Sequence, residues 1–162
     1  MTVILQKNII KIIPADTDGL LEIAKTLFRE YASSLGFDLS FQDFDKEMDD
    51  FPGQYSPPQG CLLLAEHGNE IVGCVALRDL GDGICEMKRL YVRPFFRKLN
   101  AGKALAESIV HKARDLDYAR MRLDTVPEMK AAVRLYASLG FREIAPYRHN
   151  PIEGAKYLEL VL

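Results

Sequence analysis

The chain has 162 residues, a net charge of −2 and 48% hydrophobic residues. That length suits one domain, residues 1–162, which buries about two-thirds of its unfolded surface without a disulfide or metal staple. The balanced charge argues against a general nucleic-acid surface, and no stretch approaches the roughly 18 apolar residues of a membrane span. The N-terminus also lacks the apolar core of a signal peptide, so we expect a cytoplasmic protein that binds neither nucleic acid nor membrane.

The cysteines and histidines give no sign of a metal site. Cys61, Cys74 and Cys85 form no C-x-x-C pair, and all three lie in strand-like apolar runs. An odd number of such residues predicts free, buried thiols in a reducing compartment. The three histidines are far apart and lack metal-ligand spacing, so we expect no bound metal.

The first part of the chain reads as a strand, two helices and an antiparallel meander. Pro14 ends a β-branched run, and Asp16 or Thr17 can cap the helix that follows. Three apolar runs joined by short turns then predict sequential antiparallel strands. In chain order the predicted elements are a strand over 9–13, helices over 16–35 and 41–51, and strands over 61–67, 70–80 and 84–92.

Helices and strands alternate in the second part. The predicted elements are a helix over 100–116, a strand over 119–125, a helix over 127–139, and strands over 141–145 and 155–162. Pro127 in the first turn and Gly140 just past the end bound the last helix. A strand, helix and strand across 84–125 imply a parallel pair. The sequence therefore predicts a mixed α/β fold, with a central sheet of about seven strands flanked by about four helices.

A basic turn opens the helix that starts near residue 100. Its backbone amides and helix dipole favour an anion, and its small residues let an anion approach closely. Arg97 and Ala104 stand where a Walker A loop needs Gly and Ser or Thr, and the G-x-G-x-x-G fingerprint is absent. The alternative is a solvated basic loop in which Asn100 is a plain N-cap.

The stretch "YVRPFFRKLNAGKALAESIV" resembles the acetyl-CoA-binding motif of the GCN5-related N-acetyltransferases, R/Q-x-x-G-x-G/A. Arg97 takes the first position and Gly102 the last, while Asn100 stands where a middle Gly is usual. Asn tolerates a left-handed backbone, and its side chain can cap the helix. "ICEMKRLYV" resembles the family's fourth strand and "AAVRLYASLGFRE" its L-Y-x-x-x-G-F signature. The resemblance covers residues 9–162 and implies a GNAT-like fold.

The resemblance also implies a place for acetyl-CoA, the expected co-substrate. In the family the fourth and fifth strands splay apart, and strand backbone holds the thioester and pantetheine; here those residues are Leu90, Tyr91 and Val92. Arg97 would supply charge to the pyrophosphate. The amides that would cradle it belong to Lys98, Leu99, Asn100, Ala101, Gly102 and Lys103. Met129 stands where an Asn often contacts the pantetheine arm, so that polar contact is lost or replaced.

Acyl transfer from a thioester to an amine needs a held thioester, a neutral amine and a proton for the thiolate, but no covalent nucleophile. Glu86 is a general-base candidate, acting directly or through water. Its alternative is a surface carboxylate paired with Lys88 on the same strand face. By resemblance Tyr136 is the general-acid candidate, and its alternative is a packing residue beside Phe141.

The expected acceptor is the primary amine of a small molecule, which attacks directly in a ternary complex. The alternatives are a protein N-terminus or lysine, or a non-catalytic acyl-CoA sensor. The acidic stretch 43–50 would favour a cationic or zwitterionic amine if it flanks the acceptor, or it is a solvated helix face. Residues 148–150 either border the acceptor or form a polar loop. Family members are often dimers, so a homodimer is an open expectation.

Overall fold

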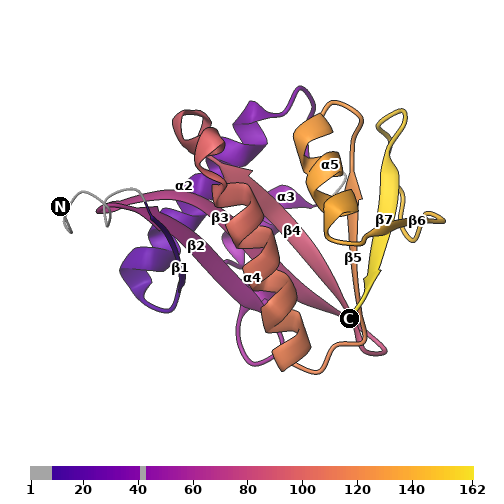
Figure 1. Cartoon of the computed structure of the whole chain (residues 1–162), viewed down its shortest axis with the longest axis horizontal. Coiled ribbons are helices and arrows are strands. Elements are labelled where there is room, and N and C mark those ends of the chain that lie inside the picture. Colours follow the sequence, from indigo (N-terminus) through magenta and orange to yellow (C-terminus); the bar gives the residue numbers. More distant parts are fainter. Residues whose placement is uncertain (1–8, 41–42) are drawn as a thin grey trace.

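The computed structural model describes residues 9–40 and 43–162, which form one sheet with helices on both faces (Figure 1). In these residues seven strands run in the order β1-β2-β3-β4-β5-β7-β6. The pair β4 and β5 is parallel, and every other neighbouring pair is antiparallel. The predicted mixed α/β class and the predicted parallel pair are therefore confirmed.

The elements follow the predicted order, with two corrections. The strands are β1 (Ile10–Pro14), β2 (Cys61–His67), β3 (Glu70–Gly81), β4 (Ile84–Val92), β5 (Arg120–Thr125), β6 (Arg142–Ile144) and β7 (Lys156–Val161). The helices are α2 (Asp18–Ser34), α3 (Phe44–Asp49), α4 (Ala101–Asp115) and α5 (Lys130–Ser138), with short 3-10 turns η2 (Gly53–Tyr55) and η3 (Pro94–Leu99).

The corrections concern where two helices begin and end. The acidic helix covers Phe44–Asp49 rather than 41–51, and residues 41–42 lie outside the described ranges. Its end fits the rule that the residue before a proline, here Phe51, avoids helical backbone. The last helix begins at Lys130 rather than Pro127, because residues 126–129 form a separate turn. The Met129 amide closes it by donating to the Val126 carbonyl at 3.1 Å.

Apolar stripes on the helices produce two cores, one on each face of the sheet. Leu105, Ile109 and Ala113 of α4 are fully buried against one face, as their helical spacing predicts. Leu27 and Phe28 of α2 are fully buried against the other. Each large apolar side chain contributes roughly 1.5–3 kcal/mol on burial. In Figure 1, α4 and α5 lie in front of the sheet, while α2 and α3 lie behind it.

The strands β4 and β5 part halfway along β4. Their parallel pairing covers three residue pairs and stops at Glu86 opposite Arg122, whereas β4 continues to Val92. A bulge lies just past this point, where the register against β3 shifts and Arg89 takes a positive φ of 60°. Beyond Glu86, β4 therefore has a paired strand in the described residues only on its β3 side.

The thiols behave as the sequence indicates. Cys61, Cys74 and Cys85 are all free and buried, so that prediction is confirmed. Burial raises the pKa of each thiol, that of Cys85 to about 12, which keeps the thiols protonated and unreactive. Across 9–40 and 43–162, no helix combines the length and the apolar character needed to cross a membrane.

Candidate active site

The basic turn before α4 has the backbone geometry of an anion site. Asn100 adopts a left-handed conformation with φ 61° and ψ 22°, the backbone conformation that Asn tolerates better than other non-glycine residues. The Asn100 side chain makes no capping hydrogen bond, so the predicted cap is wrong. The amides of Ala101, Gly102 and Lys103 belong to the first turn, where a helix offers no acceptor. They remain available to a phosphate.

Gly102 keeps the approach to this turn open. A Cβ added there would meet nothing closer than Val92 Cγ2 at 3.8 Å, an ordinary contact. The glycine is therefore not required by packing inside the protein. Its value lies on the outer side, where a larger side chain would cover the first-turn amides.

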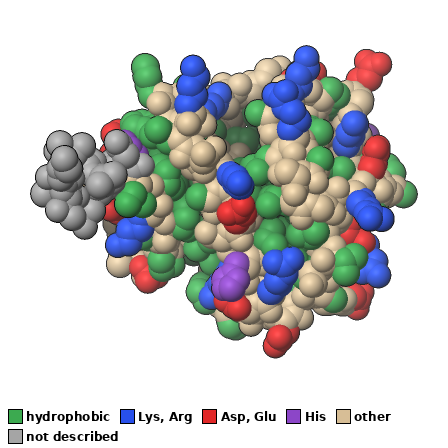
Figure 2. Space-filling view, viewed as in Figure 1, with side chains coloured by type: hydrophobic (Ala, Val, Ile, Leu, Met, Phe, Trp, Pro, Cys, Tyr) green, Lys and Arg blue, Asp and Glu red, His purple; other side chains and the backbone are tan. Residues whose placement is uncertain are grey.

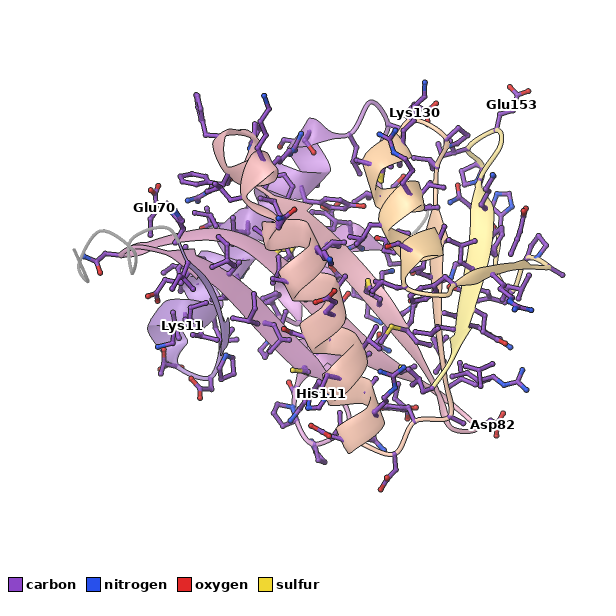
Figure 3. All side chains as sticks on the ribbon, in the orientation of Figure 1. Lys11, Glu70, Asp82, His111, Lys130 and Glu153 are labelled. Carbon is purple, nitrogen blue, oxygen red and sulfur yellow. The ribbon has the colours of Figure 1, made fainter. Side chains whose placement is uncertain are left out.

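Basic side chains surround the same end of the molecule. Arg97 Nε donates to the Val92 carbonyl at 2.9 Å, and the guanidinium lies over the Tyr91 ring at 6.0 Å, which fixes Arg97 at the end of β4. In Figure 2 the surface is hollowed between the start of α4 and α5, with Lys and Arg side chains on both sides. Lys130 stands at this end of α5 (Figure 3). A hollow lined in this way suits a polyanion.

The three residues expected to hold the thioester lie on the parted end of β4. Tyr91 pairs with Cys74 of β3 and Val92 with Gly73, while Leu90 follows the bulge. A Cβ on Gly73 would come within 2.7 Å of the Tyr91 carbonyl oxygen, so glycine is needed for this close approach. In the part of the chain that the structure describes, no strand pairs with the other edge of these residues. That edge can bond an extended ligand as an added strand would.

Tyr136 is a buried residue, and its hydroxyl oxygen keeps some exposure. The side chain is 7% exposed, and its ring packs edge-on against Phe141 at 5.7 Å between centroids, so it is also a packing residue. No residue in 9–40 or 43–162 forms a hydrogen bond with its hydroxyl. Burial, with the fields of Tyr31 and Asp124, raises the pKa of Tyr136, so the phenol is protonated at neutral pH.

Met129 lies at the N-cap of α5, where the family often has an Asn. Its sulfur accepts a 3.9 Å contact from the Thr125 hydroxyl at the end of β5. A thioether is a weak acceptor, so the strong polar group expected at this position is replaced by an apolar one.

Glu86 is a fully buried carboxylate, not a surface residue. It shares a face with Lys88, as alternation predicts, and Lys88 Nζ lies 3.9 Å from Oε1. The donors that hold it are the Arg78 Nε, at 2.8 Å from Oε1, and the Tyr147 hydroxyl, at 2.7 Å from Oε2. Arg148 also donates to Oε2. Oε2 accepts from two donors and Oε1 from one, and the carboxylate is fully buried, so an amine or a water has little access to it.

Glu86 belongs to a row of alternating charges that crosses the sheet. Register places Arg78 of β3 opposite Glu86 of β4, Glu86 opposite Arg122 of β5, and Arg122 opposite Glu159 of β7. Arg122 Nε lies 2.8 Å from Glu159 Oε2. The sequence alone did not predict Arg78 and Tyr147 as partners of Glu86. The alternation of side chains along β3 indicates weakly that Arg78 shares a face with Glu86, whereas Tyr147 comes from the loop before β7 and no local pattern indicates it.

Two further charged residues follow this row where the strands part. Lys88 on β4 and Asp124 on β5 come next on the same face, and Asp124 accepts from the Asn150 amide at 3.1 Å. Burial and the charges of Arg89 and Arg78 lower the pKa of Lys88 to about 7. We call the following residues the charged face: Arg78, Glu86, Lys88, Arg122 and Asp124.

A pocket of about 280 Å³ adjoins the charged face through Arg78. Its lining combines α3, η2 and β3: Asp43, Lys46, Glu47, Asp50, Pro52, Gly53, Gln54, Tyr55 and Arg78. Glu47 is already held by Arg89, at 3.0 and 3.1 Å, and by the Tyr55 hydroxyl at 2.7 Å. Asp43, Glu47 and Asp50 of the acidic stretch thus line a pocket, although the charge of Glu47 is neutralised by Arg89.

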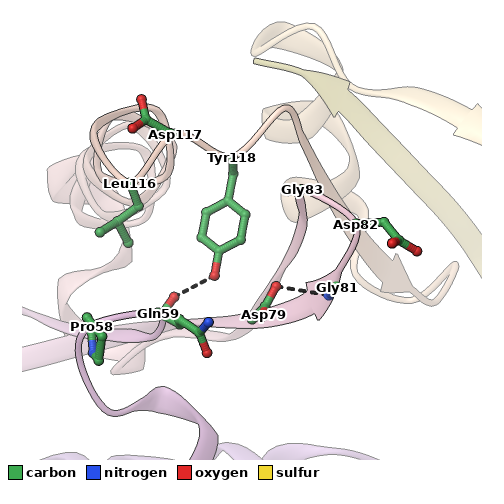
Figure 4. Close-up of a pocket in the computed structure, with 9 residues that line it drawn as sticks. All are labelled: Pro58, Gln59, Asp79, Gly81, Asp82, Gly83, Leu116, Asp117 and Tyr118. Carbon is green, nitrogen blue, oxygen red and sulfur yellow. Dashed lines mark hydrogen bonds between the residues drawn. The ribbon is translucent and has the colours of Figure 1, made fainter.

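A second pocket, of about 290 Å³, lies at the far end of α4 (Figure 4). It is bounded by the turn between β3 and β4 and by Leu116, Asp117 and Tyr118. The Tyr118 hydroxyl donates to the Gln59 carbonyl at 2.7 Å, which ties its two walls together. This pocket is separated from Gly102 by the length of α4, so we do not assign it to the site.

The fold and the site together define an acyltransferase that takes its acyl group from a coenzyme A thioester. Residues 20–141 match the Acetyltransferase (GNAT) family. An uncharacterized N-acetyltransferase of Schizosaccharomyces pombe is 44% identical over 151 residues, which cover 91% of this chain and 90% of that protein. The chain belongs to the GNAT family and is an acetyl-CoA-dependent N-acetyltransferase.

Two further comparisons bear on the ligands. The N-acetylaspartate synthetase of Danio rerio is 33% identical over 110 residues, 67% of this chain but 39% of that longer protein. The crystal structure of an acetyltransferase from Salmonella typhimurium with its cofactor acetyl-CoA has a TM-score of 0.69, 16% identity, and coverage of 94% of both chains. The second likeness shows the shared fold.

Proposed function

We propose that this protein transfers the acetyl group of acetyl-CoA to the primary amine of a small molecule by direct attack in a ternary complex. One observation carries the proposal: the pairing of β4 with β5 ends at Glu86, which leaves the backbone from Leu90 to Val92 with an open edge. That edge runs toward the left-handed turn at Asn100. A thioester and a pyrophosphate can therefore be held along one continuous stretch of backbone.

The residues of this stretch divide the binding between them. The amides of the first turn of α4 would bind the pyrophosphate, and Arg97, Lys98 and Lys103 would supply positive charge. Lys98 is exposed and the Lys103 side chain is 60% exposed, so both can reach a ligand in solvent. Met129, at the start of α5, would pack against the pantetheine arm through its apolar side chain.

Tyr136 is the proposed general acid. In the reaction the amine nitrogen forms a bond to the carbonyl carbon, the carbon–sulfur bond breaks, and the coenzyme thiolate takes a proton. The Tyr136 hydroxyl has no protein acceptor in the described residues, and burial keeps it protonated. A positioned donor of this kind typically contributes about 10²–10⁴-fold to the rate.

Glu86 is proposed to position other groups rather than to act as the base. Its two oxygens are held by Arg78, Tyr147 and Arg148, and the carboxylate is fully buried. An acceptor amine can instead lose its proton to solvent or to a group nearer the parted strands. Lys88, with a pKa of about 7, is such a group.

A small acceptor fits better than a protein chain. The pocket next to Arg78 holds about 280 Å³, near the lower end of the range for small-molecule sites. The relative named N-acetylaspartate synthetase also points to a small acceptor. A peptide would need an extended groove, which a pocket of this size does not provide.

The test is release of the coenzyme thiol in the presence of a panel of primary amines, with a control that lacks acceptor. Release above the control with small amines supports the proposal. Release only with peptides would assign the protein to protein acetylation instead. Acetyl-CoA binding without release for any amine or peptide would identify a sensor.

A further inference from the structure

Two arginines far apart in the sequence meet at one buried carboxylate. Arg78 comes from β3 and Arg148 from the loop before β7, and they donate to opposite oxygens of Glu86. Glu86 is fully buried, but the Arg78 and Arg148 side chains are 21% and 20% exposed. Both guanidinium groups can therefore be reached from outside while their shared partner cannot.

Three other carboxylates near the charged face have partners of their own, whereas Asp43 and Asp50 line the pocket beside Arg78 without contacting either guanidinium. The contacts of these three join Glu47 to Arg89, Glu159 to Arg120 and Arg122, and Asp124 to the side-chain amide of Asn150. Asp124 also acts through its field on Lys88, whose Nζ is 3.9 Å from Glu86. If the negative charge of Asp124 balances the positive charge of Lys88, then Arg78 and Arg148 both contact the single negative charge of Glu86.

Two guanidinium groups contact one buried carboxylate, so within 9–40 and 43–162 one of the two positive charges has no counter-charge of its own in direct contact. Burial, and to a lesser extent the charge of Arg78, lower the pKa of Arg148 to about 10. An excess charge in a partly buried site is costly until a counter-charge joins it. One further carboxylate would balance the group.

Both arginines keep donors for such a ligand. A guanidinium has five N–H groups. Arg78 uses Nε on Glu86 and Nη1 on Gln54 at 2.7 Å, whereas Arg148 uses Nη2 on Glu86. Their other N–H groups have no acceptor in 9–40 or 43–162. Arg78 is also part of the wall of the 280 Å³ pocket, so a molecule held there would meet it.

We propose that Arg78 and Arg148 bind the carboxylate of the acceptor, so that the substrates are amino acids rather than simple amines. This inference rests on the proposed acetyl transfer to a small amine. Glu86 then holds the two guanidinium groups in place as a positioning residue. Lys88 is two residues along β4, so its Cα lies about 7 Å from that of Glu86 at the standard rise of a strand. The acceptor amine would lie near Lys88, where β4 and β5 part.

The first experiment compares amino acids with their carboxamides as acceptors. The panel holds α-amino acids, β-alanine and γ-aminobutyrate, each beside its carboxamide, so that charge changes but length does not. We expect kcat/KM of the wild type to be at least tenfold higher for the best carboxylate than for its amide. A wild type that uses both equally, or prefers the amide, overturns the inference.

The second experiment removes one arginine at a time. Arg78→Gln and Arg148→Gln each leave Glu86 with at least two donors, so both variants should fold. Each should lower kcat/KM for the carboxylate by about 10–100-fold, the range expected for a bond to a charged group, and change the amide rate by less than about threefold. Arg120→Gln is the matched control, because the Arg120 side chain is 53% exposed and contacts Glu159. Equal loss for carboxylate and amide would overturn the inference.

A binding measurement separates failure of the inference from failure of the proposed reaction. Calorimetry with N-acetylated amino acids and their amides needs no turnover. If no amine releases coenzyme thiol but the wild type binds the N-acetylated acids and Arg78→Gln does not, the proposed reaction fails and the carboxylate site stands. If neither the wild type nor the variant distinguishes acid from amide, the carboxylate site is wrong, whatever the activity.

Discussion

The basic turn at the start of α4 and the charged face of the sheet differ in the groups that they offer to a charged ligand. The turn offers backbone amides within a few consecutive residues, from Asn100 to Lys103, and its conformation depends on one left-handed residue. The charged face is built from side chains of three strands that register brings together. A site made of backbone amides keeps most of its geometry when its side chains change. A site made of side chains, such as the charged face, depends on each of those side chains.

The two regions also correspond to the two substrates of the proposed reaction, the coenzyme and the acceptor. Backbone recognition suits a group that all family members share, the pyrophosphate of the coenzyme. Side-chain recognition suits the acceptor, which differs between members of one fold. Changes at the turn should therefore affect acetyl-CoA binding rather than the acceptor, and changes on the charged face should affect stability and the acceptor.

The largest expected effect is the loss of acetyl-CoA binding in Gly102→Glu. A carboxylate in the anion site opposes the pyrophosphate by several kcal/mol, so affinity should fall about 10²–10³-fold. At 100 times its Kd the ligand adds about 2.7 kcal/mol to the wild type, a shift of about 5–10 °C in Tm. Thermal melts with and without ligand check this.

The control for this change is Gly19→Glu. Gly19 is the second residue of α2, as Gly102 is of α4, and a Cβ there meets nothing within 4 Å. This variant should keep the full ligand-induced shift. A folded Gly102→Glu protein with an undiminished shift would place the phosphates elsewhere.

The next largest effect is expected on turnover in Tyr136→Phe. The ring and its contact with Phe141 remain, and only the proton is removed. Turnover should fall by at least about 10²-fold, with little change in acetyl-CoA affinity. Tyr118→Phe, at the far end of α4, is the matched control. Turnover within about threefold of the wild type would make Tyr136 a packing residue only.

Glu86→Gln should destabilise the fold. Removing the charge leaves Arg78 and Arg148 partly buried without a counter-ion, and breaking a buried ion pair costs about 3–5 kcal/mol. Urea denaturation measures the change. Glu107→Gln, in an exposed pair with Lys103, should cost less than about 1 kcal/mol. A stable Glu86→Gln protein that has lost only turnover would restore Glu86 as the base.

Lys88 should make stability depend on pH. Its folded pKa of about 7 lies below the ordinary value of 10.5, so above pH 7 the unfolded chain binds a proton that the folded chain does not. Stability should then rise between pH 7 and 9, by at most about 1.4 kcal/mol per pH unit. The charges that act on Lys88 include those of Arg89, Arg78, Glu47 and Asp124.

Lys88→Met should remove this rise, while exposed Lys103→Met should keep it. Denaturant titrations at pH 7, 8 and 9 measure the slope for each protein. Parallel slopes for the wild type and Lys88→Met would show that Lys88 keeps an ordinary pKa in the folded protein.

The smallest effect is expected at Asn100. A left-handed backbone costs most L-residues about 1–2 kcal/mol, and Asn less. Asn100→Ala should therefore lose about 1 kcal/mol of stability, and Asn100→Gly should change it little. If both variants match the wild type by chemical denaturation, the positive φ of this residue is not needed.

Local patterns were enough to predict most of the fold and to mark the basic turn as a candidate coenzyme site. The order of strands and helices, the parallel pair, the left-handed turn at Asn100 and the buried thiols follow from periodicity, turn chemistry and family motifs. Each depends on residues close together in the chain, which the sequence displays directly.

Tertiary structure alone decided the rest. The burial of Glu86 and its contact with Arg148, 62 residues away, depend on segments that are distant in the chain. The start of α5 at Lys130 depends on a turn that packing selects. Strand register determines these contacts, because a slip of one residue would move Glu86 to the other face. The sequence by itself determined which elements form and where the coenzyme motif lies. The meeting of distant side chains, and with it the proposed choice of acceptor, arises only when the sheet assembles.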